Sequence, residues 1–212
     1  MAASTNRPLF ARFWLWVSPG IERGGMAKHR DDLLAGLSGR VIEVGAGNGL
    51  NFGHYPPEVT QVVAVEPNPL LRRVAVGAAA RAPVPVEVTD GTADRLPAAD
   101  ADFDAGVASL VLCSVPDQPA ALRELYRVIR PGGELRFLEH VQATTPGLRR
   151  VQRALDATFW PMICGGDHLG RDTAAEIEGA GFRTERLDRL RFPDSRLTIP
   201  STPHILGRAS RP

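Results

Sequence analysis

Cysteine is scarce in this chain, and its scarcity excludes two kinds of site. The 212 residues include only Cys113 and Cys164, which are too few for a disulfide framework and are not spaced like the ligands of a zinc motif. The histidines and acidic residues show no metal-site spacing either. The sequence therefore predicts no metal site and a compartment that keeps thiols reduced, which favours a cytoplasmic location.

An excess of charge and a long hydrophobic run are missing as well. Lysine and arginine number 25 against 24 acidic residues, a formal net charge of +1, so we expect no nucleic-acid partner. The apolar N-terminal stretch, residues 7–17, is shorter than the roughly 20 residues that span a bilayer and lacks a signal-peptide cleavage site. We expect no transmembrane segment; Trp14 and Trp16 allow at most a weak contact with a membrane surface.

The remaining composition is that of an ordinary globular domain. Hydrophobic residues make up 43% of the chain and charged residues 23%, and the length fits one domain with a buried core. Apolar runs alternate with helical periods, an order typical of a mostly parallel sheet covered on both faces. Strands are expected at 40–44, 61–65, 84–88, 103–110, 134–139, 182–192 and 204–209, and helices at 22–37, 68–80, 117–129, 144–160 and from 173 to 179.

Two of these helices carry specific expectations. The helix at 144–160 has an apolar stripe that predicts a packing face, formed by Leu148, Val151, Leu155 and Phe159. Thr173-x-x-Glu176 fits a capping box, which places the start of the next helix at Thr173.

The most informative segment is a glycine-rich turn after the first strand. The run Glu43-x-Gly45-x-Gly47-x-Gly49 follows an apolar β-branched stretch, and a lone acid, Glu66, closes the next strand. Glycines in such a turn bring backbone N–H groups against a ligand because no Cβ blocks the approach. The acid is then placed to accept hydrogen bonds from both ribose hydroxyls, so the pattern predicts a nucleoside cofactor.

The glycine spacing discriminates between cofactors. Dinucleotide folds use G-x-G-x-x-G, but here the third glycine comes one residue early and Leu50 stands in its place. The turn resembles motif I of the class I S-adenosylmethionine (SAM) methyltransferases. Further segments resemble that family in the same order, namely Glu66-Pro67, residues 91–97 (G-T-A-D-R-L-P), 103–107 (F-D-A-G-V) and 127–133 (R-V-I-R-P-G-G).

This resemblance implies an α/β, Rossmann-like class I methyltransferase fold: a mostly parallel seven-stranded sheet with helices on both faces and an antiparallel last strand. It implies SAM as cofactor, with S-adenosylhomocysteine as product, in a single domain over 1–212. Residues 1–38 would be a helical lid, 39–141 the SAM-binding core, and 142–212 the acceptor-side helices and closing strands. The implied cofactor-binding residues are Glu43, Gly45, Ala46, Gly47, Asn51, Glu66, Pro67, Thr92, Ala93, Ser109 and Leu110. Thr92 replaces the family's acid, and Asp90 or Asp94 is the alternative contact to adenine.

A narrower resemblance concerns the acceptor. Segments 51–57, 66–69, 159–161, 166–173 and 203–207 are similar to the methyltransferase-like alkyl-thiol S-methyltransferases of the methyltransferase type 11 family. This implies a small-molecule acceptor, a thiol before others. Quinone and phospholipid methyltransferases are also similar, so O-, C- or N-methylation of a quinone, phospholipid or small natural product stays an alternative, as does a non-catalytic SAM-binding protein. A nicotinamide-dependent oxidoreductase is disfavoured because the sole lysine, Lys28, forms no Tyr-x-x-x-Lys pair.

The candidates for acceptor chemistry follow from position. His168, beside Asp167 in a glycine-flanked loop, is the first choice for orienting or deprotonating the acceptor, and His140 at the carboxyl end of the fifth strand is the second. The alternative is that these residues cap or support neighbouring elements. His204 and Cys113 are expected to pack. An aromatic lid over the acceptor site is expected from Phe13, Trp14, Trp16, Phe159 and Trp160.

Overall fold

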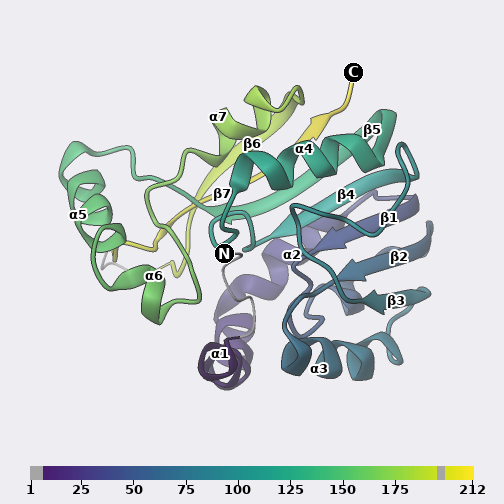
Figure 1. The fold of residues 1–212 in the computed structure, drawn as a ribbon, viewed down its shortest axis with the longest axis horizontal. Helices are drawn as coiled ribbons and strands as arrows, with labels where there is room; N and C mark the ends of the chain where they lie inside the picture. The colour runs from purple at the N-terminus through teal and green to yellow at the C-terminus, as the bar shows by residue number, and fades with distance from the viewer. Residues whose placement is uncertain (1–6, 195–198) are drawn as a thin grey trace.

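The computed structural model describes residues 7–194 and 199–212, and a seven-stranded sheet forms its centre. The strand order is β3-β2-β1-β4-β5-β7-β6 (Figure 1). Strands β1 to β5 pair in parallel, and β7 runs antiparallel to both β5 and β6. The expected sheet is therefore confirmed. The strands are β1 Gly39–Val44, β2 Val59–Val65, β3 Val86–Thr89, β4 Phe103–Ser109, β5 Ile129–His140, β6 Arg183–Arg191 and β7 Pro203–Ser210.

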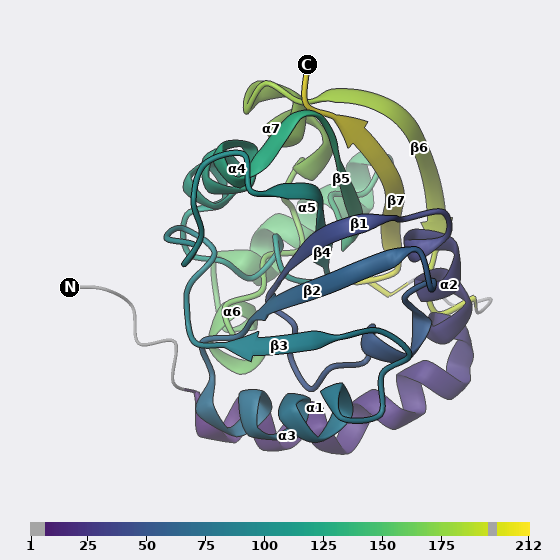
Figure 2. The same ribbon diagram turned by 90° about the vertical axis from the view of Figure 1, so that its right-hand side faces the viewer.

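Helices cover both faces of the sheet. The helices α4 and α7 lie over one face of the sheet, and α2 and α3 lie over the other (Figure 2). Buried side chains of each pair belong to the hydrophobic cluster on their side of the sheet. The helices are α1 Pro8–Ile21, α2 Ala27–Leu34, α3 Pro69–Ala79, α4 Gln118–Val128, α5 Pro146–Asp156, α6 Trp160–Ile163 and α7 Thr173–Gly179, with a short 3-10 helix η2 at Phe52–His54. No helix of the described ranges is long and apolar enough to span a bilayer.

The helix expected at 22–37 differs from the structure. A helix already begins at Pro8, and an irregular turn η1, Glu22–Met26, separates α1 from α2. Gly25 has a φ of 113°, a backbone conformation that interrupts a regular helix. The result is a separate helix α1 placed ahead of the helix that leads into β1.

The helix expected at 144–160 is also divided, and its apolar stripe is not a continuous packing face. The chain forms α5 and then the short α6, and Val151 and Phe159 are exposed. The inward position is taken by Gln152, which accepts a hydrogen bond from Ala143 N (2.7 Å) and donates to Pro200 O (2.8 Å). Because the Gln152 side chain provides hydrogen-bond partners for backbone groups of two loops, the face of α5 that carries Gln152 is the buried one.

The helix cap expected at Thr173 lies one residue earlier. The Asp172 carboxylate accepts a hydrogen bond from Ala175 N (3.4 Å) at the start of α7. The Thr173 side chain is buried instead and accepts from Gln118 Nε2 (3.0 Å).

The strand order reverses direction between β1 and β4. Successive strands run outward from β1 to β3, whereas β4 returns to the other side of β1. In open α/β sheets, ligands bind outside the carboxyl ends of the strands at such a reversal. We therefore expect the ligand site at the residues that follow β1 and β4.

Candidate functional site

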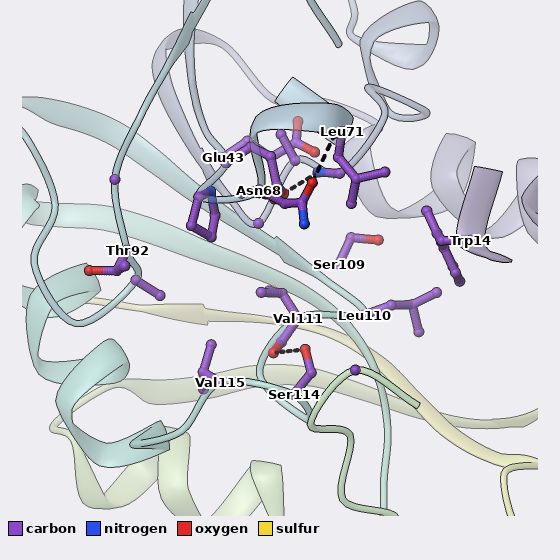
Figure 3. A pocket seen from close by; sticks show the side chains of 18 of the residues that line it. Trp14, Glu43, Asn68, Leu71, Thr92, Ser109, Leu110, Val111, Ser114 and Val115 are labelled. Carbon is purple, nitrogen blue, oxygen red and sulfur yellow. Dashed lines mark hydrogen bonds between the residues drawn. The ribbon is translucent and has the colours of Figure 1, made fainter. Parts of the chain in front are cut away.

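A cavity of about 570 Å³ opens at this reversal point, within the range of about 300–1,000 Å³ typical of small-molecule sites. Figure 3 shows Trp14 on one side of it and Thr92 on the opposite side, with Ser109 and Leu110 between them. All eleven residues expected to bind a cofactor line this cavity: Glu43, Gly45, Ala46, Gly47, Asn51, Glu66, Pro67, Thr92, Ala93, Ser109 and Leu110. Asp94 also lines it, whereas Asp90 does not.

The glycine-rich turn after β1 forms the floor of the cavity. Gly45 and Gly47 have φ angles of 64° and 58°, in the left-handed region that favours glycine. A Cβ at Gly45 would overlap the Val111 side chain, so this glycine is required for packing. A Cβ at Gly47 would meet only Trp14 Nε1, at 3.7 Å. The missing side chain of Gly47 therefore leaves space in the cavity itself.

Glu66 joins this turn to the turn after β2. Its Oε2 accepts a hydrogen bond from Gly47 N and its Oε1 accepts one from Asn68 N, each at 2.8 Å. Asn68 in turn caps α3, since its Oδ1 accepts from Leu70 N (3.0 Å) and Leu71 N (3.2 Å). Burial raises the pKa of Glu66, although the two backbone hydrogen bonds oppose the shift. The carboxylate is held in place at the cavity wall before any ligand arrives.

A second buried acid lies at the end of β1. Glu43 accepts hydrogen bonds from Asn51 Nδ2 (2.8 Å) and from the Tyr55 hydroxyl (2.7 Å). Burial raises the pKa of Glu43 to about 7, although both hydrogen bonds and the charge of Arg30 oppose the shift. The acid fixes Asn51, which lines the cavity two residues after the last glycine of the turn.

Arg30 is a cavity residue that the sequence did not reveal. Its Nη1 donates to Asn51 Oδ1 (2.7 Å) and Ser109 Oγ (3.1 Å), and its Nη2 forms an ion pair with Glu22 (3.1 Å). The guanidinium is buried and reaches the cavity from α2. The sequence does contain a signal for Arg30. It occupies an inward position of α2, whose other buried residues, Leu33 and Leu34, are apolar, as are the flanking buried residues Met26 and Leu37.

The buried Glu43 makes stability depend on pH. Because its pKa is about 7 in the folded protein and 4.5 ordinarily, its contribution is fully present below about pH 4.5 and is lost as the pH rises through 7. The shift corresponds to about 3 kcal/mol. The free energy of unfolding, measured by urea denaturation between about pH 5 and 8, should therefore fall more steeply in the wild type than in Glu43→Gln. Parallel pH profiles for the two proteins would contradict this assignment.

The three residues expected to be catalytic do not line the cavity. His140 Nε2 lies 2.9 Å from Asp167 Oδ2, which also accepts from Trp160 Nε1 (2.8 Å). His168 contributes its backbone N–H, which donates to Cys113 O (2.9 Å). His140 and Asp167 are thus brought together behind the cavity wall, while neighbouring residues form that wall: Ser114, Val115 and Gly165.

One residue of the expected aromatic lid reaches the cavity. Trp14 lines it and donates through Nε1 to Asn48 Oδ1 (3.1 Å), whereas Phe13, Trp16 and Phe159 are exposed. Phe10, one helical turn before Trp14, also lines the cavity, and its ring stacks on the Trp14 ring with centroids 6.4 Å apart. Arg7, directly before α1, also lines the cavity, and its Nη1 donates to Pro161 O of α6 (3.4 Å).

His204 and Cys113 are both buried, as expected for packing residues. The His204 ring lies edge-on to Phe192 and His140, with ring centroids 5.9 and 5.7 Å away. Burial and, to a smaller extent, the charge of the neighbouring His140 lower the pKa of His204 to about 4. His204 is therefore a neutral packing residue at neutral pH.

Comparison with known proteins identifies the family. A family model described as "Methyltransferase domain" matches residues 42–137. The human thiol S-methyltransferase TMT1A is 35% identical over 182 residues, which cover 83% of this chain and 73% of that protein. The ubiquinone/menaquinone biosynthesis C-methyltransferase UbiE of Syntrophotalea carbinolica is 31% identical over 213 residues, covering 95% and 82%.

The solved structures agree on the fold. A Thermotoga maritima protein described as a SAM-dependent methyltransferase, possible histamine N-methyltransferase, superimposes with a TM-score of 0.70 at 21% identity, covering 96% of this chain and 98% of that one. The methyltransferase domain implies the use of SAM. The chain thus belongs to the methyltransferase type 11 family of class I enzymes and is a SAM-dependent methyltransferase of small molecules.

Proposed function

We propose that this enzyme transfers the methyl group of SAM to a small thiol. The observation that carries the proposal is the 35% identity, over 83% of the chain, with a human protein named as a thiol S-methyltransferase. The cavity supports it through two features: a set of groups suited to SAM, and an acceptor side that lacks a strong base.

We assign the cofactor contacts by matching the chemical groups that line the cavity to the parts of SAM. Glu66 accepts hydrogen bonds from the ribose hydroxyls, and the bare backbone of Gly47 lies against the nucleoside. Thr92, Ala93 and Asp94 border the adenine. At the other end, Arg30 supplies a buried positive charge beside Ser109, which suits the carboxylate of the methionine part.

The acceptor side of the wall is mostly apolar, formed by Phe10, Leu110, Val111, Val115 and Pro116. Within the described chain, no histidine, lysine, cysteine or tyrosine lines the cavity, and the side chains there that can accept a proton are the carboxylates of Glu43, Glu66, Asp94 and Asp117. A thiol has a reference pKa of about 8.5, so a few per cent is already thiolate near pH 7. A hydroxyl or carbon nucleophile needs a stronger base. This wall is therefore better suited to a thiol.

When bound, SAM would supply an electrophilic methyl carbon for transfer to the acceptor sulfur and would leave as S-adenosylhomocysteine. The residues of the chain position the two reactants. Glu66 and the glycine turn hold the nucleoside, and Phe10 and Trp14 cover the cavity and exclude water. Holding reactants in line lowers a barrier by up to about 7–11 kcal/mol in ideal cases.

The pH profile of turnover tests this proposal. If the enzyme takes a thiolate already formed in solution, kcat/KM for methylation should rise with pH and level off at the pKa of the acceptor. Two alkyl thiols of different acidity should then give profiles displaced by the difference between their pKa values, measured with labelled SAM. Profiles that level off at the same pH for both thiols would show that an enzyme group limits the reaction.

A carbon or oxygen acceptor is the second candidate, favoured by the similarity to UbiE. A panel of thiols, phenols, quinols and amines separates the two. Methylation of a quinol ring without methylation of any thiol would replace our proposal.

A further inference from the structure

A mixed cluster of ligand-type side chains lies directly behind the acceptor side of the cavity. It consists of Cys113 from the loop after β4, His140 at the end of β5, and Asp167 from the loop after α6. One ligand atom from each lies within 4.8 Å of the other two. Cys113 and Asp167 are 2% and 8% exposed. We propose that this Cys–His–Asp cluster binds a divalent transition-metal ion of the zinc class.

One carboxylate oxygen of the cluster is unused. Asp167 Oδ1 is buried and has no hydrogen-bond partner within the described ranges. Buried polar atoms without partners are rare in native proteins and cost about 1–3 kcal/mol each. A coordinated cation would satisfy this oxygen and would bind His140 through Nε2, the ring nitrogen that faces Asp167.

The chemical type of the three ligands favours a transition metal. A thiolate, an imidazole and a carboxylate together favour zinc or a related transition metal over magnesium or calcium, which take oxygen ligands. Binding replaces the Cys113 S–H bond with a sulfur–metal bond and releases the proton to solvent. The carboxylates of Glu139 and Asp167 supply negative charge around the thiol, which favours a cation there.

Hydrogen bonds from surrounding residues hold the cluster in place. Trp160 Nε1 donates to Asp167 Oδ2 (2.8 Å), and the Cys113 backbone is fixed by His168 N on its carbonyl (2.9 Å) and by Glu139 Oε2 on its N–H (3.3 Å). Such outer contacts orient metal ligands. Three protein ligands leave a fourth position open, the arrangement of catalytic zinc sites.

The cluster is connected to the proposed function because residues next to its ligands in the chain form part of the cavity wall. Ser114 follows Cys113 directly and Gly165 lies two residues before Asp167, and both line the cavity. A bound ion would tie these two wall segments to the end of β5. The sequence could not suggest this site because its ligands lie on three separate segments with no motif spacing.

Cobalt(II) tests the proposal without relying on activity. The purified 212-residue protein is treated with a chelator, desalted and titrated with Co²⁺. We expect saturation at one equivalent with a thiolate-to-cobalt charge-transfer band in the near ultraviolet, and displacement of the band by Zn²⁺. The charge-transfer band should disappear in Cys113→Ala and persist in the matched control Cys164→Ala. Asp167→Asn should weaken Zn²⁺ binding by at least about 10- to 100-fold in competition with an indicator dye.

The wild-type spectrum alone can overturn the proposal, whatever the variants do. Absence of a charge-transfer band at saturating Co²⁺ means that Cys113 binds no metal. An equally strong band in Cys113→Ala would place the ion elsewhere. Calorimetry with SAM checks that each variant still folds, so that a lost band can be assigned to lost metal binding. The methyl-transfer assay tests the proposed function separately, because its outcome does not depend on metal binding.

Discussion

Replacement of Gly47 by valine is expected to abolish SAM binding. The Cβ position of Gly47 faces the cavity, with Trp14 Nε1 at 3.7 Å as the only atom nearby, so the new side chain takes space that the nucleoside needs. The left-handed φ of 58° adds strain of roughly 1–2 kcal/mol for a residue with a Cβ. Calorimetry with SAM should therefore detect no binding, while circular dichroism shows a folded protein.

Gly132→Val is the matched control for this variant. Gly132 also has a left-handed φ, 77°, but a Cβ there meets nothing within 4 Å, and the residue does not line the cavity. It should lose comparable stability and keep its SAM affinity. A normal dissociation constant in Gly47→Val, or an equal loss in Gly132→Val, would contradict the role of the bare backbone at position 47.

Glu66→Ala should weaken SAM binding by about 1.5–3 kcal/mol, the range for hydrogen bonds to a charged group, or roughly 10- to 150-fold in the dissociation constant. The reason is that the carboxylate is already oriented by Gly47 N and Asn68 N, so little ordering opposes its bonds to the ribose. Glu58→Ala, which removes an exposed acid near the start of β2, should bind SAM normally.

A ligand change isolates the ribose contact. Adenosine and its 2′,3′-dideoxy analogue differ only in the two hydroxyls, so they form a cycle with the wild type and Glu66→Ala. The variant should lose affinity for adenosine and little for the analogue. Equal losses for both ligands would mean that Glu66 acts by holding the turns together.

Much of this architecture was predictable because its signals are local. The alternation of apolar runs with helical periods predicted the sheet, and the glycine spacing after β1 predicted a nucleoside site at one edge. The order of the motifs then predicted which residues line the cavity. Gly45, Gly47 and Glu66 act through their own backbone or a single carboxylate, so residue type and spacing carry the information.

The parts that escaped prediction depend on contacts between distant segments. Arg30 reaches Ser109 across 79 positions of the chain, and its inward direction depends on how α2 packs. Val151 and Phe159 fit a helical period, yet the loop backbone around Ala143 selects Gln152 as the buried side chain. His168 has suitable chemistry, but only its backbone is used towards Cys113. The hydrophobic periodicity of a helix does not show which of its side chains will contact a segment that is distant in the sequence.

The contact between Arg7 and Pro161 has a consequence for folding order. These residues are 154 positions apart, so the contact that Arg7, a residue of the cavity wall, makes with α6 needs the chain to be synthesised at least as far as Pro161. Contacts of such separation form late because a long loop must first be closed. The cavity is lined by segments from Arg7 to Gly165, so the binding free energy of a ligand that fills it adds to the stability of the folded enzyme.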